Sequence, residues 1–294
     1  MDTSIKLKGD KVIEQIPSIK DKALRINLHD NIYGTFAEIG AAQETVRHFF
    51  RSGGSSGTIA KAMSAYDKDF SDAIYGIEED GRYVTESRLK KMITKEVNLI
   101  EDRLKRDKHP NKMFFSFANT VATIDFAKKF KGHGWVGIKF QIEPDEDYNE
   151  IILHIRFKET DARLQQETLG VLGVNLIYGA FYKYNDPKKL LRYLYDHLDK
   201  DQLEIDTINF AGPRFADVDN RLMSLQLVKN GMTDAVMFDP NGNNILPAAI
   251  LYKKNILALR GSFRPVTNVN IDMYERSLKM FLQENKVEEE NTLV

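Results

Sequence analysis

The stretch WVGIKFQIEPDEDYNEIILHIRF, residues 135–157, decides the class of the fold. Its two halves place apolar side chains at every second position: Val136, Ile138, Phe140 and Ile142, then Ile151, Leu153, Ile155 and Phe157. A period of two is typical of β-strands, and the acidic segment PDEDYNE between the halves is suited to a turn. The stretch therefore predicts an antiparallel hairpin, with His154 and Arg156 on its outer face.

Helical periodicity surrounds this hairpin. Apolar residues recur at three- or four-residue steps over 84–106, namely Leu89, Ile93, Val97, Ile100 and Leu104, which predicts an amphipathic helix. The segment 161–184 is apolar on more than one face, so we expect a helix buried at the centre of the core. A second helix is expected over 187–197, since Pro187 suits a first helical position.

The N-terminal third also has helical spacing. Phe36, Ile39, Val46 and Phe50 predict a helix that ends at SGGSSG, residues 52–57, and residues 58–76 resemble a second helix. The fold class is therefore α+β or mixed α/β, with a helical N-terminal third followed by a mixed sheet with β-hairpins and packed helices. We expect a mostly helical region over 1–110, a mixed α/β region over 111–285 that forms either its own domain or one continuous domain with the first, and an acidic tail over 286–294.

The C-terminal third alternates short elements. We predict a strand over 203–210, a helix over 217–231 closed by Gly231, and a hairpin of strands 234–238 and 245–252. A short strand over 256–261 and a final helix beginning near Asn270 follow.

Composition excludes several function classes. The 294 residues include 42 Lys and Arg, 43 Asp and Glu, and no Cys. The balanced charge gives no general attraction to nucleic acid or membrane, and the lack of Cys excludes disulfides, thiolate metal sites and a cysteine nucleophile. Residues 169–182 are too short to span a bilayer, and residues 1–17 lack the apolar core of a signal peptide, so we expect a cytoplasmic protein.

The glycine-rich segment SGGSSGTIAK, residues 52–61, is the first candidate binding site. Glycines allow close backbone approach to a phosphate, and a following helix would offer N–H groups and a favourable dipole. The candidate phosphate ligands are Gly53, Gly54, Gly57, Thr58 and Lys61. The alternative is a flexible connection between helices, because the segment is not a Walker A loop.

Three further positions carry candidate chemistry. Asp69 and Asp72 share one helix face, where they either contribute to a magnesium site or form a solvated acidic surface. His133, between two glycines and before the only Trp, is either a general acid or base at a loop tip or a residue that opens a strand. Arg214 and Asp219 lie at a strand-to-helix turn of the kind that carries binding groups in α/β folds, where the neighbouring Asp217 is an equally suitable N-cap.

The segment GSFRPVTNVN, residues 261–270, resembles the first-strand signature of the nicotinamide/nicotinate mononucleotide adenylyltransferases, G-S/T-F-x-P-x-H/T-x-x-H. In that family the glycine allows the ATP phosphates to approach the backbone, and the closing histidine stabilises the transferring phosphate. The resemblance implies phosphate contacts from Gly261, Ser262, Phe263, Arg264, Thr267 and Asn270. Asn270 stands where the family has histidine, and an amide cannot supply positive charge.

A broader resemblance covers residues 22–285. The segments IYGTFAEIGAAQE, LQQETLGVLGVNLIYGAFY and RGSFRPVTNVNIDM look like a family of longer bacterial proteins labelled nicotinate-nucleotide adenylyltransferase-like. It implies a small nucleotide ligand, ATP or an NAD-type nucleotide with Mg²⁺, bound without adenylyl transfer by this chain, and a further portion after Val294. The alternative is a non-enzymatic scaffold or regulatory protein that forms homo-oligomers.

Overall fold

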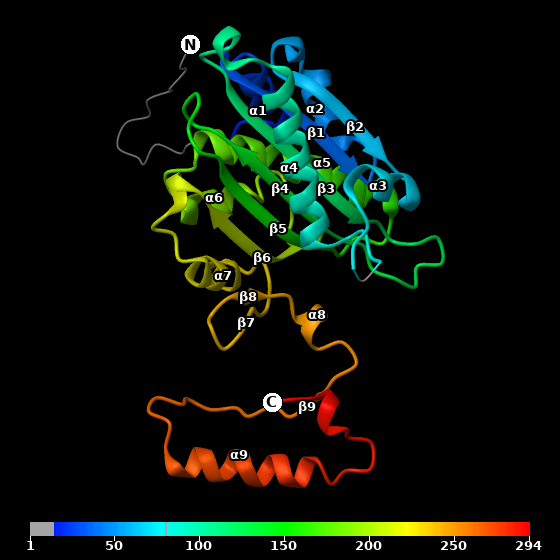
Figure 1. Cartoon of the computed structure of the whole chain (residues 1–294), viewed down its shortest axis with the longest axis vertical. Helices are drawn as coiled ribbons and strands as arrows, with labels where there is room; N and C mark the ends of the chain where they lie inside the picture. The colour runs from blue at the N-terminus through cyan, green and yellow to red at the C-terminus, as the bar shows by residue number, and fades with distance from the viewer. Residues whose placement is uncertain (1–14, 80) are drawn as a thin grey trace. The chain divides into compact units, whose positions relative to one another are not determined.

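The computed structural model describes residues 15–79 and 81–294 and divides into two compact units, Met1–Ala235 and Val236–Val294 (Figure 1). The first unit runs through residue 110, where the alternatives were a domain boundary or one continuous domain. One sheet joins strands from both sides of that position, so the N-terminal region and the segment that follows it share a core. The N-terminal stretch examined for a targeting signal lies mostly outside the described residues.

The first unit is built on a six-stranded mixed sheet in the order β2-β1-β3-β4-β5-β6. β1 is parallel to β2 and β3, whereas β3, β4, β5 and β6 are successively antiparallel. The hairpin predicted over 135–157 is confirmed as β4 and β5. The strands are β1 Ile32–Ile39, β2 Ile59–Ala65, β3 Met113–Ala122, β4 His133–Phe140, β5 Asn149–Phe157 and β6 Leu203–Ala211.

Helices cover both faces of this sheet (Figure 1). α4 packs against β1, β3 and β4 on one face, while α5 lies on the other face with α1 and α2. Phe181 of α5 contacts Phe115 and Phe140 edge-to-face. A mixed α/β fold is thereby confirmed. The helices are α1 Ile19–Asn27, α2 Glu44–Ser52, α3 Lys68–Tyr75, α4 Glu86–Arg103, α5 Ala162–Tyr182, α6 Pro187–Tyr193 and α7 Asn220–Lys229.

The two long helices form where the sequence predicts them. α4 begins after Thr85, whose hydroxyl accepts a hydrogen bond from the Arg88 N–H, and it buries the apolar stripe that includes Leu89 and Ile93. α5 begins after Asp161, which caps it in the same way, and residues 172–181 are all buried. Its central position in the core is confirmed.

Two helix predictions in the N-terminal third are wrong. Phe36 and Ile39 lie in β1, and the helix of this region begins only at Glu44. Residues 59–65 form β2 instead of the start of a helix, and the helix α3 begins only at Lys68. Both segments pair in parallel with a neighbouring strand, and this tertiary pairing overrides the local helical pattern.

The second unit contains short elements: β7 Met237–Phe238, β8 Asn244–Ile245, α8 Pro247–Ile250, β9 Asn255–Ile256, α9 Asn268–Phe281 and β10 Thr292–Leu293. β7 and β8 form the predicted hairpin, but half of the expected strand 245–252 is the helical turn α8. The expected strand 256–261 ends at Ile256, and the C-terminal tail pairs with it through β10. Among the described residues, no helix has the length and apolarity that crossing a membrane requires.

Candidate functional site

A chain of polar side chains lies at the carboxyl edge of the parallel strands, on the face of the sheet covered by α4. His133 opens β4 opposite Ala122, the last residue of β3, and Arg156 lies opposite His133 on β5. His154 lies opposite Trp135 in the same hairpin. Because directly opposed residues of antiparallel strands share a face, the two histidines and Arg156 project to the same side.

A β-bulge adds a carboxylate to this group. His154 pairs with Thr207 and Ile155 pairs with Ile205, so Asp206 is the extra residue between them. Bulges re-aim side chains, and here Asp206 Oδ1 lies 2.7 Å from His154 Nδ1. His154 Nε2 in turn lies 3.3 Å from His133 Nδ1. The result is a continuous Asp206–His154–His133 chain that ends at a half-buried imidazole.

The electrostatics of the chain keep His133 neutral. Burial lowers the pKa of His133 to about 4, and the neighbouring His154 and the guanidinium groups of Arg156 and Arg82 act in the same direction. Arg156 Nε also lies 3.1 Å from Asp206 Oδ2. At neutral pH the site therefore combines an uncharged imidazole with nearby positive charge.

Arg82 belongs to the segment between α3 and α4. Thr120 near the end of β3 donates a hydrogen bond to the Tyr83 carbonyl oxygen over 2.6 Å, which ties this segment to the edge of the sheet. At the start of the segment, Gly76 and Glu78 accept hydrogen bonds from the buried Arg88 of α4. Arg82 lies between these anchors in the sequence, and its positive charge contributes to the lowered pKa of His133.

Of the predicted site residues, His133 is the one that the structure places in this chain. His154 was expected on an outer face, which is wrong: its side chain is 2% exposed and lies against the rings of Trp135 and His133 and the carboxylate of Asp206. Sequence reasoning did not identify Asp206 as a site residue. The signal was present, since Asp206 is a charged residue inside the apolar strand 203–210.

The glycine segment lies at the opposite edge of the sheet, where β1 and β2 begin. Gly53 and Gly54 have positive φ angles and end α2, and Gly57 closes a single 3₁₀ turn. Thr58 donates a hydrogen bond to the Asn27 carbonyl oxygen and precedes a strand, so it caps no helix. Lys61 pairs with the buried Glu96 over 2.7 Å. The helix dipole on which the phosphate prediction depended is therefore absent from this segment.

The two carboxylates of the acidic pair on α3 have different surroundings. Asp72 pairs with the buried Arg88, whereas Asp69 lies exposed in the first turn. Within residues 15–79 and 81–294, no three His, Asp or Glu side chains converge as a metal ion would require. The predicted magnesium site at Asp69 and Asp72 thus has no further ligands in the described part of the chain.

Arg214 and Asp219 have local partners at the other end of β6. Arg214 pairs with Glu143 and Glu146, each over 2.8 Å, and so ties the β4–β5 turn to this edge. Asp219, not the Asp217 that we considered as an alternative, is the N-cap of α7, where it accepts hydrogen bonds from the N–H groups of Arg221 and Leu222.

The adenylyltransferase-like segment lies in the second unit. Thr267 caps α9, and Asn270 Oδ1 accepts hydrogen bonds from the Thr267 N–H and hydroxyl, each over 2.8 Å. A Cβ at Gly261 would lie 3.1 Å from the ring of Phe263. Ser262 and Arg264 precede the cap as exposed residues. Asn270, at the position of the family's histidine, thus has its side-chain oxygen engaged in the N-terminal cap of α9.

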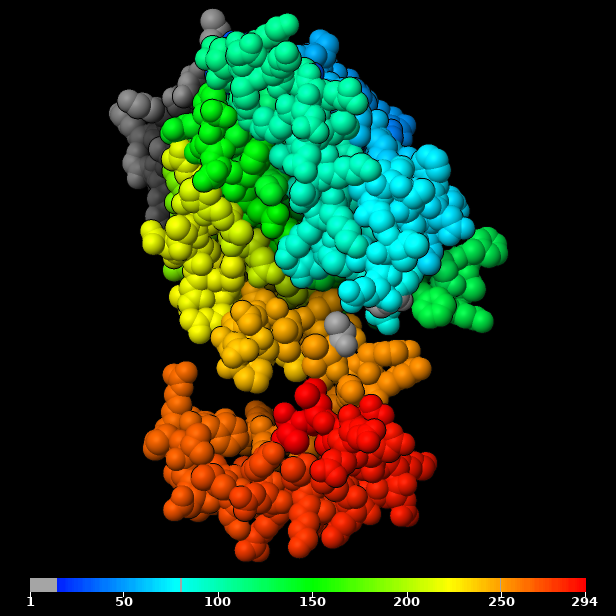
Figure 2. Space-filling view, viewed as in Figure 1, coloured from blue at the N-terminus to red at the C-terminus, as the bar shows by residue number. Residues whose placement is uncertain are grey.

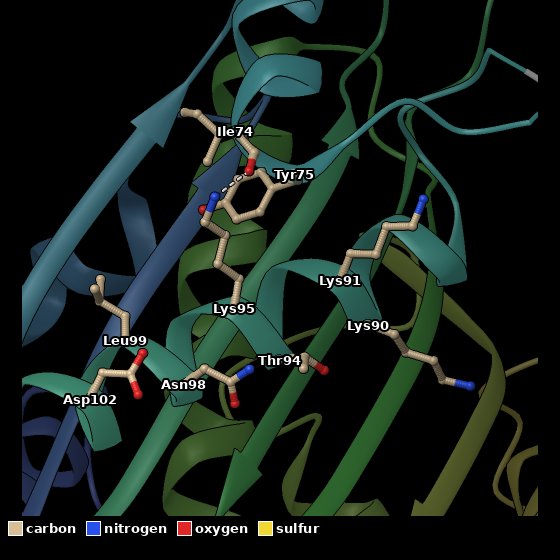
Figure 3. A pocket seen from close by; sticks show the side chains of 9 residues that line it. All are labelled: Ile74, Tyr75, Lys90, Lys91, Thr94, Lys95, Asn98, Leu99 and Asp102. Carbon is tan, nitrogen blue, oxygen red and sulfur yellow. Dashed lines mark hydrogen bonds between the residues drawn. The ribbon is translucent and has the colours of Figure 1, made fainter.

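A shallow groove of about 620 Å³ lies between α3 and α4 (Figure 3). Its lysines are already engaged: Lys95 donates to the Ile74 carbonyl oxygen, Lys91 pairs with Glu78, and Lys90 pairs with Glu86. Its lining residues are Ile74, Tyr75, Lys90, Lys91, Thr94, Lys95, Asn98, Leu99 and Asp102.

Comparison with known proteins finds similarity only among solved structures. No protein-family model and no curated protein sequence matches the chain. The competence/damage-inducible protein CihA from Agrobacterium tumefaciens matches with a TM-score of 0.39 and 14% identity, over 56% of this chain and 97% of its own. A competence or damage-inducible protein from Enterobacter asburiae matches with a TM-score of 0.38 and 11% identity, over 56% and 98%.

A CinA superfamily protein from Enterobacter cloacae matches with a TM-score of 0.37 and 12% identity, over 61% of this chain and 99% of its own. These neighbours are thus competence/damage-inducible proteins, and each is covered almost completely by part of this chain. Similarity at this level carries no functional argument, which therefore depends on the site itself.

Proposed function

We propose that the first unit binds a nucleotide-class anion at the carboxyl edge of its sheet. The observation that carries the proposal is the neutral, half-buried His133 held beside Arg156 and Arg82. Positive charge favours a phosphate, and a neutral imidazole nitrogen forms a directed hydrogen bond with a hydroxyl or amide. A ligand with an anionic group and hydrogen-bond donors would pair with both the guanidinium groups and the imidazole nitrogen.

The topology supports this location. From β1 the chain passes through α2 to β2 on one side, and β3 lies on the other side of β1. In open α/β sheets, ligands bind outside the carboxyl ends of strands where the connections diverge in this way. At this edge His133 opens β4 opposite Ala122, the last residue of β3.

The loop before His133 adds aromatic surface. Phe126 is fully exposed and Phe130 is 73% exposed, and the loop projects from the first unit in green in Figure 2. The backbone is nevertheless ordered by hydrogen bonds, because Asp125 accepts from the Lys128 and Phe130 N–H groups. Exposed rings on such a preorganised turn suit stacking with a nucleotide base, and Lys128 adds positive charge.

Titration calorimetry with AMP, nicotinamide mononucleotide, NAD and ATP with Mg²⁺ tests the proposal, with adenosine as the ligand that lacks phosphate. We expect at least one nucleotide to bind and Arg156→Gln to weaken it about tenfold. Arg163→Gln is the matched control, since Arg163 is an exposed arginine paired with Glu167 on α5. Absence of binding to every nucleotide at millimolar concentration, or equal loss in both variants, would contradict the proposal.

An interaction protein is the second candidate function, and α9 favours it. No residue of this helix is buried, and Val269 and Met280 are 75% and 69% exposed. Exposed apolar helix residues mark surfaces for partners. Light scattering at increasing protein concentration tests self-association, and a mass that falls to the monomer in Val269→Asp would support this role.

A further inference from the structure

The Asp206–His154–His133 chain has a defined direction of hydrogen bonding. An ionised carboxylate only accepts, so Asp206 Oδ1 accepts a hydrogen bond from His154 Nδ1–H. A neutral His154 then has an unprotonated Nε2, which accepts from Nδ1–H of His133. The remaining nitrogen of His133, Nε2, is left without a proton.

We infer that the hydrogen-bonded chain Asp206–His154–His133 fixes His133 in the tautomer protonated on Nδ1. We further infer that Nε2 of His133 selects ligands that present a hydroxyl or amide N–H donor. The inference deepens the proposed function and rests on it for the place of the ligand. The ligand class is a hydroxyl-bearing anion, which means a ribonucleotide in preference to the same nucleotide without ribose hydroxyls.

The direction depends on His154 being neutral. A protonated His154 would donate from Nε2 and would turn His133 Nε2 into a donor. In the neutral form each ring nitrogen of His154 has one role. Nδ1 donates to Asp206 Oδ1 over 2.7 Å, and Nε2 accepts from His133 Nδ1 over 3.3 Å.

Selectivity among ligands follows from the fixed direction of hydrogen bonding at His133. A half-buried acceptor loses its water when a ligand binds, and a ligand without a donor leaves it unpaired. A site built to pair with a substrate hydroxyl discriminates against analogues that lack it. One neutral hydrogen bond corresponds to about tenfold in affinity.

Nitrogen-15 NMR of the histidine-labelled chain at pH 7.5 measures the tautomer without any ligand. We expect His133, assigned by the loss of its resonances in His133→Gln, to be protonated on Nδ1 alone. Asp206→Asn should mix the two tautomers, because an amide can donate as well as accept. Glu204→Gln is the control, since Glu204 lies on the same strand but accepts from Thr233. A His133 protonated on Nε2 in the unmodified chain would overturn the inference whatever binds.

The second measurement compares AMP with 2′,3′-dideoxy-AMP by calorimetry. We expect AMP to bind about tenfold more tightly and the difference to shrink in Asp206→Asn. Equal affinities together with the expected tautomer would overturn the selectivity and leave the proposed function intact. Failure of both nucleotides to bind would overturn the selectivity for ribonucleotides, and failure of nicotinamide mononucleotide, NAD and ATP as well would overturn the proposed function.

Discussion

The carboxylate of Glu38 accepts a hydrogen bond from the side-chain amide of Asn119 over 2.9 Å, and this contact joins the ends of the adjacent parallel strands β1 and β3. The same carboxylate accepts from the N–H groups of Thr45 and Val46 in the first turn of α2. A buried side chain thus caps the helix that follows its own strand. Asn119 Oδ1, on the same amide, has no hydrogen-bond partner.

Glu38 should make the stability of the first unit depend on pH. Burial raises the pKa of Glu38 from 4.5 to about 7, despite the hydrogen bonds that favour the charged form. Below pH 4.5 both folded and unfolded chains are protonated here. As the pH rises towards 7 the unfolded chain ionises first, so the free energy of unfolding falls by up to roughly 3 kcal/mol.

Urea denaturation between pH 4.5 and 8 checks this dependence, with Glu38→Gln as the comparison. The glutamine remains neutral, and its amide can donate to Asn119 Oδ1. We expect the variant to gain stability relative to the unmodified chain as the pH rises. Parallel curves for the two chains across this range would contradict the pKa shift.

Arg88→Met should destabilise the first unit by about 3–5 kcal/mol. Arg88 is completely buried, and its guanidinium contacts Ser71, Asp72 and Glu78. Removing it leaves two carboxylates without their buried partner. Thermal denaturation measures the loss. Arg47→Met, which removes an exposed i,i+3 pair with Glu44, should change stability by less than about 1 kcal/mol. Similar losses in both variants would disprove a special role for burial.

The hairpin β4–β5 and the helices α4 and α5 were predictable because the spacing of their apolar residues matches the faces that they bury. In the segment 59–65, by contrast, Ala62, Met63 and Lys61 favour a helix, yet the segment pairs with β1. The spacing of Phe36, Ile39, Val46 and Phe50 imitates one helix although the first two residues lie in a strand. Single-sequence patterns contain no information about which segment lies beside which, and that pairing decided both cases.

The candidate site was predictable only at His133. His154 was expected to face outwards because one face of a hairpin is commonly solvated, but this sheet is covered on both faces. Asp206 lies 52 positions from His154 in the sequence and meets it through a bulge. Neither the distant pairing nor the extra residue of the bulge has a signature in the sequence.

Leu172→Ala should lower the free energy of unfolding by about 2–5 kcal/mol. Leu172 is fully buried in the middle of α5, so the truncation removes apolar contacts and leaves a cavity. Leu164→Ala in the first turn of the same helix is the control, since Leu164 is 38% exposed. Chemical denaturation of both variants tests the assignment of α5 to the core. A loss below about 1 kcal/mol for Leu172→Ala would contradict it.

The chain alone should not form a dinucleotide from ATP and nicotinamide or nicotinate mononucleotide. Asn270 stands where the resembled family has a phosphate-stabilising histidine, and its oxygen is engaged with Thr267. Within the described residues of the second unit, each sheet has two strands of two residues, and the parallel pair β9–β10, whose first strand precedes Gly261 in the sequence, is far shorter than a Rossmann-like sheet. A missing transition-state donor lowers turnover by roughly 10²–10³, and the lost positioning lowers it further.

Pyrophosphate release with Mg²⁺ measures this reaction for the unmodified chain, Asn270→His and Gly261→Val. We expect none of the three to exceed the rate without protein, because Asn270→His supplies a cation but no nucleotide-binding sheet. Val266→Ala is the control for folding of the same exposed segment. Turnover by the unmodified chain that persists in Val266→Ala and disappears in Gly261→Val would show that GSFRP is a working transferase turn.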